Sequence, residues 1–270
     1  ALSTSTCGGD GEGVRNREGD IASGPAVTAF AAHAEGGGSV NLFADATLVT
    51  RGEGSYGVLL QSIGGGGGQG GSITGNASAS AGTADASFEL GADASSAGDG
   101  GAGGQASNVT ARLSGKIATS GTQSVGVLAQ SIGGGGGAGG SITTTAANSG
   151  NTTYAASASF GMGGKGGNGG AAGDVSLITN SGQSLTVSTS GESATGVLLQ
   201  SIGGGGGQGG AIYSNAASSS TDATLGGLAV GASGAGGAGG NSGTIAINAA
   251  DLSISTSGNN SIALLTQSIG

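Results

Sequence analysis

One glycine-rich element occurs three times along the chain and starts a fourth time at the last residues. The copies are GVLLQSIGGGGGQGGSI at 57–73, GVLAQSIGGGGGAGGSI at 126–142, GVLLQSIGGGGGQGGAI at 196–212 and a partial copy, ALLTQSIG, at 263–270. The spacings between their glutamines are 69, 70 and 67 residues, for Gln61, Gln130, Gln200 and Gln267. A fixed period of this kind is typical of repeat architectures, in which neighbouring units stack and bury one continuous core.

The residues ahead of each copy repeat as well. One equivalent position is held by Thr50, Thr119, Thr189 and Thr256. Two residues later the chain has Gly52, Gly121, Gly191 and Gly258. Because glycine is common where the backbone must reverse, we expect a turn at each of these places.

A second glycine cluster lies halfway through each repeat, at 98–104, 163–170 and 234–240. Together with the clusters of the repeated element, glycine-rich segments recur about every 34 residues. The repeat of about 69 residues would then consist of two half-repeats, so we predict rungs of about 34 residues, with three rungs of about 23 residues as the alternative. With either rung length, equivalent residues of neighbouring repeats would not lie on adjacent rungs, so a direct ladder of glutamines is not expected.

Between the clusters, apolar residues alternate with small or polar ones. Leu185 and Val187 show this pattern, as do Leu252 and Ile254. Alternation with period two predicts half-buried strands, and the abundance of glycine opposes helix. We predict an all-β fold, a right-handed parallel β-solenoid (β-helix) without substantial helix. Residues 39–270 would form the solenoid, and residues 1–38 would form an irregular or degenerate N-terminal cap.

Glycine makes up 67 of the 270 residues. We predict two roles for the clusters: positive φ angles at the corners of the rungs, and flat faces without side chains where another backbone can approach closely. Residues 76–96 alternate alanine with small polar residues. Such an interior is thin, so the sheets on its two sides should lie close together.

Composition excludes several classes of function. The net charge is −9, and the six cations (Arg15, Arg17, Arg51, Arg112, Lys116 and Lys165) form no basic stripe, so we predict no nucleic-acid partner. No apolar run is long enough to span a membrane, so we expect no direct membrane insertion by this segment. The N-terminal residues lack the pattern of a signal peptide, which indicates a mature chain or a fragment.

The repeated motif resembles a known family. G-[VI]-x-x-Q-S-[IV]-G-G-G-G-G, preceded by T-x-G-x-x-S-x-G and followed by GGxGG runs, is similar to the repeats of bacterial autotransporter (type V secretion) passenger regions, over about residues 39–270. The resemblance implies a secreted β-helix on the surface of a Gram-negative cell, attached to an outer-membrane β-barrel elsewhere in the same polypeptide. It implies no catalytic residues. Barrel strands are missing and the chain stops within the motif, which suggests a piece of a longer protein.

Candidate catalytic and metal-binding residues are few. Cys7 and His33 are the only residues of their types, and we interpret both as incidental parts of the cap. Two acidic groups could bind calcium or form a carboxylate pair: Asp85, Glu89, Asp93 and Asp99, and Asp10, Glu12, Glu18 and Asp20. We interpret both groups as solvated. A glycosidase cleft needs aromatic residues, and this chain has no Trp, three Tyr and four Phe. The chain also lacks the nonapeptide repeat of calcium-binding β-rolls. We predict no enzyme activity, no metal and no cofactor.

The equivalent glutamines and threonines are therefore the positions of interest. We interpret each glutamine as an inward or corner amide that bonds to neighbouring backbone, with a recognition surface as the alternative. A threonine array could also bind ice, although its neighbours vary. We predict a structural or adhesive passenger segment at the cell surface, partnered by itself or by other surface molecules. A subunit of an extracellular filament or biofilm fibre is the alternative, and a β-helix polysaccharide-active enzyme is a minor one.

Overall fold

The computed structural model describes residues 14–15, 21–22, 27–33, 36–79, 88–149, 154–219 and 223–270, and the regular elements among them are all β-strands. Sheet A contains β1 (Val14–Arg15), β2 (Ile21–Ala22), β4 (Val40–Thr50), β8 (Val109–Thr119), β12 (Val175–Ile178), β13 (Ser184–Thr189), β17 (Ile245–Asn248) and β18 (Asp251–Thr256). Sheet B contains β3 (Val27–His33), β5 (Tyr56–Gly64), β9 (Val125–Ile132), β14 (Thr195–Ile202) and β19 (Ile262–Ile269). Sheet C contains β6 (Ile73–Ala79), β10 (Ile142–Ser149) and β15 (Ile212–Ser219). Sheet D contains β7 (Phe88–Ser96), β11 (Tyr154–Met162) and β16 (Ala223–Ala232).

All strand pairs between the described residues are parallel, which confirms the predicted all-β parallel solenoid. Both predicted rung lengths, a half and a third of a repeat, are wrong. Val58 lies opposite Val127, and Val127 lies opposite Val197, so each rung takes one whole repeat of the sequence. A rung of a half or a third of a repeat would place other residues side by side.

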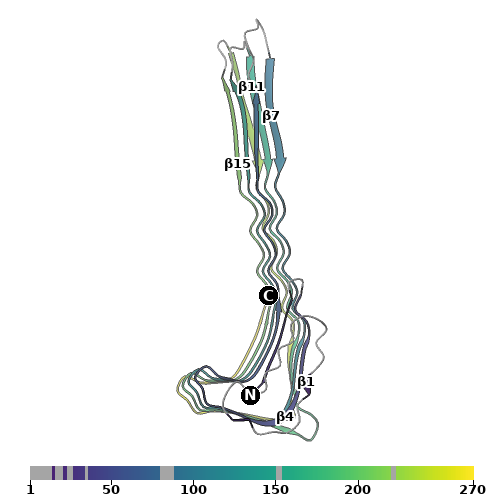
Figure 1. The fold of residues 1–270 in the computed structure, drawn as a ribbon, viewed down its shortest axis with the longest axis vertical. Helices are drawn as coiled ribbons and strands as arrows, with labels where there is room; N and C mark the ends of the chain where they lie inside the picture. Colours follow the sequence, from purple (N-terminus) through teal and green to yellow (C-terminus); the bar gives the residue numbers. More distant parts are fainter. Residues whose placement is uncertain are drawn as a thin grey trace.

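Each rung has two parts, which Figure 1 shows as a hooked base and a long, narrow blade. The base consists of sheets A and B. From sheet B the chain enters an outbound glycine segment (64–72, 133–141 and 203–211), then a strand of sheet C. It returns through a strand of sheet D and an inbound glycine segment (97–105, 163–171 and 233–241) to sheet A. The two glycine clusters of a repeat therefore belong to one rung and run in opposite directions.

The hydrophobic core lies in the base. Sheet A contributes Leu42, Leu177 and Val187, and sheet B contributes Leu60 and Leu199, all fully buried. The alternation read from the sequence directs these side chains inward. In β8, Gly115 has a φ of 93°, and a Cβ there would lie 2.4 Å from the carbonyl oxygen of Ala46. Glycine is therefore required at this position of β8.

The outer half of the blade is a thin sandwich of sheets C and D. Its interior is filled by Ile142, Thr144 and Ala146 on one side and by small residues such as Ser159 and Gly161 on the other. The Ser159 hydroxyl donates to Thr144 Oγ1 over 2.6 Å. A Cβ at Gly161 would lie 2.9 Å from Ile142 Cγ2. The two sheets therefore lie close together over a thin interior, as predicted.

The expected turns are present between sheets A and B at 52–55, 121–124, 191–194 and 258–261. In each turn the left-handed residue is the third one, for example Gln123 with a φ of 56°. The first residue is glycine for another reason: a Cβ on Gly121 would lie 1.9 Å from the carbonyl oxygen of Gly52 in the rung below.

Candidate functional site

The repeated glutamines form a continuous ladder on sheet B. Gln61 lies opposite Gln130, which lies opposite Gln200, and Gln200 lies opposite Gln267. The Gln61 Nε2 atom donates to Gln130 Oε1 over 2.7 Å, and Gln130 and Gln200 each donate to the next glutamine in the same way. The expectation that glutamines of neighbouring repeats would not meet is therefore wrong. The interpretation of each glutamine as an amide that bonds to neighbouring backbone is also wrong, because the amides bond to one another along the stack, from Gln61 to the last rung.

The repeated threonines also stack in register, at the end of sheet A. Thr50, Thr119 and Thr189 are buried. The hydroxyl of Ser55 donates to Thr50 Oγ1, and that of Ser124 donates to Thr119 Oγ1, both over 2.9 Å. Thr189 Oγ1 is buried without a partner, because Ala194 occupies the place of that serine. These buried hydroxyls fix the turn and do not present an ice-binding face.

A third row, the serine after each glutamine, was missed by the sequence analysis. Ser131 is buried, donates to the carbonyl oxygen of Ser107 over 2.9 Å and accepts the N–H of Gly173 over 2.8 Å. Ser201 makes the equivalent bonds to Gly173 and Gly243. The row ties sheet B to the returning inbound chain at the root of the blade. Period-two alternation from Leu60 to Ser62 already pointed this serine inward.

The glycine segments follow a triplet rule, Gly-Gly-X, with a period of three that is also the period of a polyproline-II helix. The exceptions are Ala97 and Ser233, which hold the first position where an inbound segment leaves sheet D. The first N–H of a triplet bonds within its own layer, as from Gly136 to the carbonyl of Gly205 over 2.8 Å. The second bonds across the blade, as from Gly137 to the carbonyl of Gly101 over 2.8 Å. The third residue, X, faces outward and carries the side chains of both segments, such as Gln69, Asp99 and Asn168.

Steric contacts explain this rule. A Cβ on Gly136 would lie 1.9 Å from the carbonyl oxygen of Gly167, and one on Gly137 would lie 2.0 Å from that of Gly68. At the X position Gly205, a Cβ would meet nothing within 4 Å. The predicted close approach of backbones is confirmed. The predicted corner role is wrong, because no glycine of these segments has a positive φ; the described glycines with one are Gly54, Gly115 and Gly182.

Side chains at and beside the X positions cap the N–H of the next rung. The Asp99 carboxylate accepts the N–H of Lys165 over 2.7 Å. Where the inbound chain enters sheet A, Asp174 Oδ1 accepts the N–H and the hydroxyl of Thr244 over 2.7 and 2.8 Å. These two bonds, first the backbone one, lower the pKa of Asp174 below its usual range.

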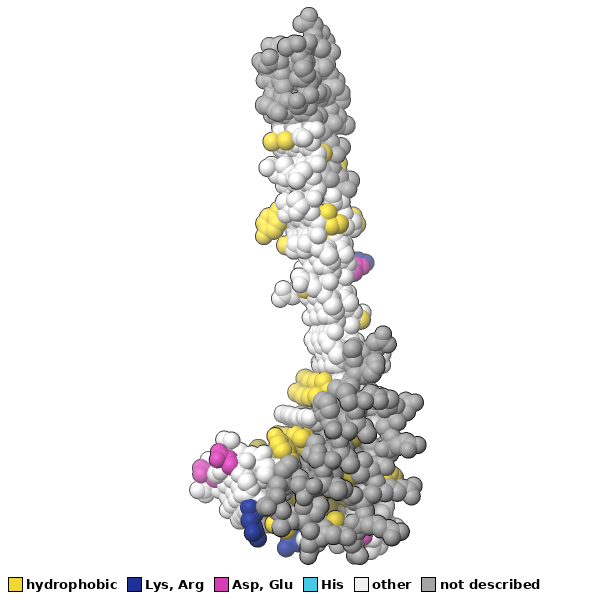
Figure 2. Space-filling view, in the orientation of Figure 1, with side chains coloured by type: hydrophobic (Ala, Val, Ile, Leu, Met, Phe, Trp, Pro, Cys, Tyr) yellow, Lys and Arg dark blue, Asp and Glu magenta, His cyan; other side chains and the backbone are white. Residues whose placement is uncertain are grey.

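Two surfaces could contact another molecule. The first is on the outer face of sheet D, where exposed apolar side chains line a hollow of about 440 Å³. It is lined by Phe160, Met162, Val230 and Ala232 together with Ser95, Ser96 and Gly161. Figure 2 shows hydrophobic side chains spaced along a blade that carries little charge, while most of the visible charge lies on the base.

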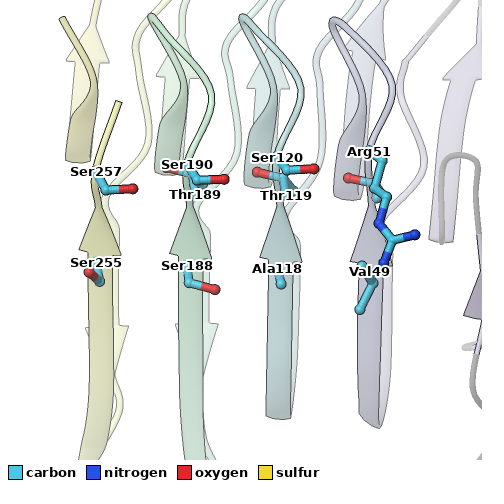
Figure 3. A pocket seen from close by; sticks show the side chains of 11 residues that line it. Val49, Arg51, Ala118, Thr119, Ser120, Ser188, Thr189, Ser190, Ser255 and Ser257 are labelled. Carbon is cyan, nitrogen blue, oxygen red and sulfur yellow. The ribbon is translucent and has the colours of Figure 1, made fainter. Parts of the chain in front are cut away.

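The second surface is a hollow of about 240 Å³ at the end of sheet A, lined mostly by hydroxyl groups. Figure 3 shows Arg51, Ser120, Ser190 and Ser257 in one row across four rungs, with Ser188 and Ser255 below them. This hollow has one guanidinium and, among its lining residues, no acid or base positioned against the hydroxyls. It offers hydrogen bonds to a polar partner.

Several predicted candidates lie outside what the structure describes. Cys7 and the acidic residues Asp10, Glu12, Glu18, Asp20 and Asp85 are not among the described residues. His33, Glu89 and Asp93 are described only as backbone positions of β3 and β7. Elsewhere in the described chain, no group of three or more His, Cys, Asp or Glu residues is placed to hold a metal.

In the part of the chain that the structure covers, no helix could cross a membrane. Comparison with known proteins gives no match to a family model, to a curated protein or to a solved structure.

Proposed function

We propose that this chain is a structural and adhesive surface segment, similar in role to the passenger region of a secreted bacterial autotransporter. The apolar face of sheet D supports this proposal. Met162 is 59% exposed, Leu228 56% and Val230 45%, and all lie on the blade, away from the core of the base. Exposed apolar side chains grouped on one surface are typical of interaction sites.

The placement of the repeated side chains, inside the stack or on the outer faces of the blade, supports an adhesive role over a catalytic one. The residues that repeat most regularly, the glutamine, threonine and serine rows, form hydrogen bonds within the stack. The side chains on the outer faces project from a long blade, in rows that recur with each rung. A partner that engages several of these repeated positions at once is held more tightly than by any single contact.

The test is adhesion of particles coated with the full chain to bacterial cells and to hydrophobic beads. The double variant Met162→Ser/Val230→Ser removes two exposed apolar side chains from sheet D, and we expect most of the adhesion to be lost. Tyr213→Ser, a change of similar kind on the opposite face of the blade, is the control and should adhere like the unmodified chain. Equal adhesion of all three proteins would exclude the sheet D face as the adhesive surface. Protease treatment of intact cells tests whether the segment is on the surface.

A further inference from the structure

Charge is divided unequally between the two faces of the blade. The outbound half of each repeat, at 57–79, 126–149, 196–219 and 263–270, contains no Asp, Glu, Lys or Arg. Charged residues make up 8% of the chain, so several would be expected over stretches of this combined length. The inbound stretches of the blade carry Glu89, Asp93 and Asp99 on one rung and Lys165 on the next, whereas that of the third rung, 223–241, is uncharged. Sheets C and D pack through their inner faces, so the outer face of sheet C and of the outbound glycine segments is one uncharged surface.

We propose that this uncharged face pairs with the same face of a second copy of the chain. A net charge of −9 makes two copies repel each other, and the repulsion is smallest where neither copy carries charge. The inference goes beyond the proposed function, because it holds whether or not sheet D is adhesive.

The spacing of the face selects a second copy as the partner. Equivalent outward residues recur once per rung, at about 4.8 Å, in parallel and in register. Paired sheets with this repeat can interdigitate along their whole length when both have the same spacing. A second copy of the chain has that spacing on every rung.

The size of the face suits a stable dimer. Nine residues of glycine segment at about 3.1 Å each and about seven of sheet C at about 3.3 Å give a length of about 50 Å. Three rungs at about 4.8 Å give a width of about 14 Å, and so about 700 Å² per copy. Specific interfaces bury roughly 800 Å² per partner. Figure 1 shows that the blade is straight over this length, which permits face-to-face contact.

Two local features fit close contact. Tyr213, on the outer face of sheet C, is 69% exposed, and tyrosine is enriched among the residues that dominate interface energies. Near the root of the blade, the outward X position is glycine on all three rungs, Gly66, Gly135 and Gly205, although no neighbour within the chain requires it at Gly205. A row without side chains lets a partner approach the backbone.

The test is sedimentation equilibrium of the full chain from about 1 to about 300 µM, a range that covers the micromolar affinities of interfaces of this size. We expect a monomer–dimer equilibrium that added salt does not weaken. Ala138→Glu places one charge on the uncharged face and should raise Kd tenfold or more. Ala171→Glu is the matched control on the inbound face and should leave Kd unchanged. Both positions lie between longer side chains on adjacent rungs: Gln69 and Gln208 around Ala138, and Gln105 and Asn241 around Ala171.

A monomer over the whole range, or equal weakening by the two glutamate variants, would overturn the proposal. If circular dichroism shows that Ala138→Glu is unfolded, Tyr213→Ser replaces it, since the Tyr213 side chain is mostly exposed and its loss should not unfold the chain. Its removal should also raise Kd about tenfold. The variant Met162→Ser/Val230→Ser should dimerise normally. Loss of adhesion and loss of dimerisation are therefore separate results.

Discussion

At the scale of single residues, stacking in register means that each side chain meets its own equivalent, and this limits which residues can be used. A glutamine amide both donates and accepts, so a row of glutamines can bond along the whole stack. Carboxylates cannot, and like charges on facing strand positions are destabilising. Among the described neighbours, Asp99 meets Lys165, and Asp174 lies between Asn108 and Thr244. The small share of charged residues, 8%, follows from this geometry.

The unpaired hydroxyl of Thr189 gives a prediction at this scale. Ala194→Ser restores the donor that Ser124 supplies to Thr119 one rung below, in a site that is equally buried. Because a typical hydrogen bond contributes about 1 kcal/mol net, we expect the free energy of unfolding to rise by about that amount. Thermal denaturation followed by circular dichroism measures it. Ser124→Ala is the mirror control and should lower stability. If Ala194→Ser has no effect or destabilises, the serine–threonine bond is not what fixes the turn.

At the scale of elements, the strands could be predicted from the sequence and the glycine segments could not. Alternation around Leu185 and Val187 gave both the strand type and the buried face. The glycine clusters have few side chains to show a period of two or 3.6, so the sequence indicated corners as well as flat faces and did not show that the clusters are long extended segments. In the structure they are long extended segments that pair across the blade, and this is why the rung is twice the expected length. A period of three was visible in GGKGGNGG at 163–170.

The triplet rule makes the second prediction. Gly137→Ala would place a methyl group 2.0 Å from the carbonyl oxygen of Gly68, which can move only if two rungs separate. Overpacking of this kind costs about 1–3 kcal/mol. Urea denaturation measures the loss. Ala138→Gln, on the adjacent residue, adds a much larger side chain at an X position flanked by Gln69 and Gln208, and should leave stability unchanged. Equal losses of stability in Gly137→Ala and Ala138→Gln would mean that the second glycine of a triplet tolerates a side chain no less than the X position does, which would contradict the triplet rule.

At the scale of the whole molecule, the repeat stacks along one axis, and each rung pairs with the rungs on either side of it. The side chain of Gln183 reaches further, since its Nε2 atom donates to Asp45 Oδ2 two rungs away over 3.2 Å. Each repeat contributes a strip of core to the base and a strip of blade. Both candidate surfaces, the apolar face of sheet D and the uncharged face of sheet C, consist of one strip of side chains from each rung. The sequence could not assign residues to the two faces, because that assignment depends on the blade folding back on itself within a single rung.

Deletion of a whole repeat tests this architecture. Removing residues 126–195 joins Val125 to Gly196 and brings β14 into the place of β9, with Gln200 against Gln61. Because every row is continued in register, we expect the shortened chain to fold with the same circular dichroism spectrum per residue. It should unfold cooperatively at a lower temperature, since one set of rung–rung contacts is lost. Removing residues 126–160, half as many, is the control: it joins the start of sheet B to the end of a sheet D strand, breaks the rows of every later rung, and should prevent folding. If the half-repeat deletion folded and the whole-repeat deletion did not, the stacking unit would be half a repeat, and the pairing of the two glycine segments within one rung would be wrong.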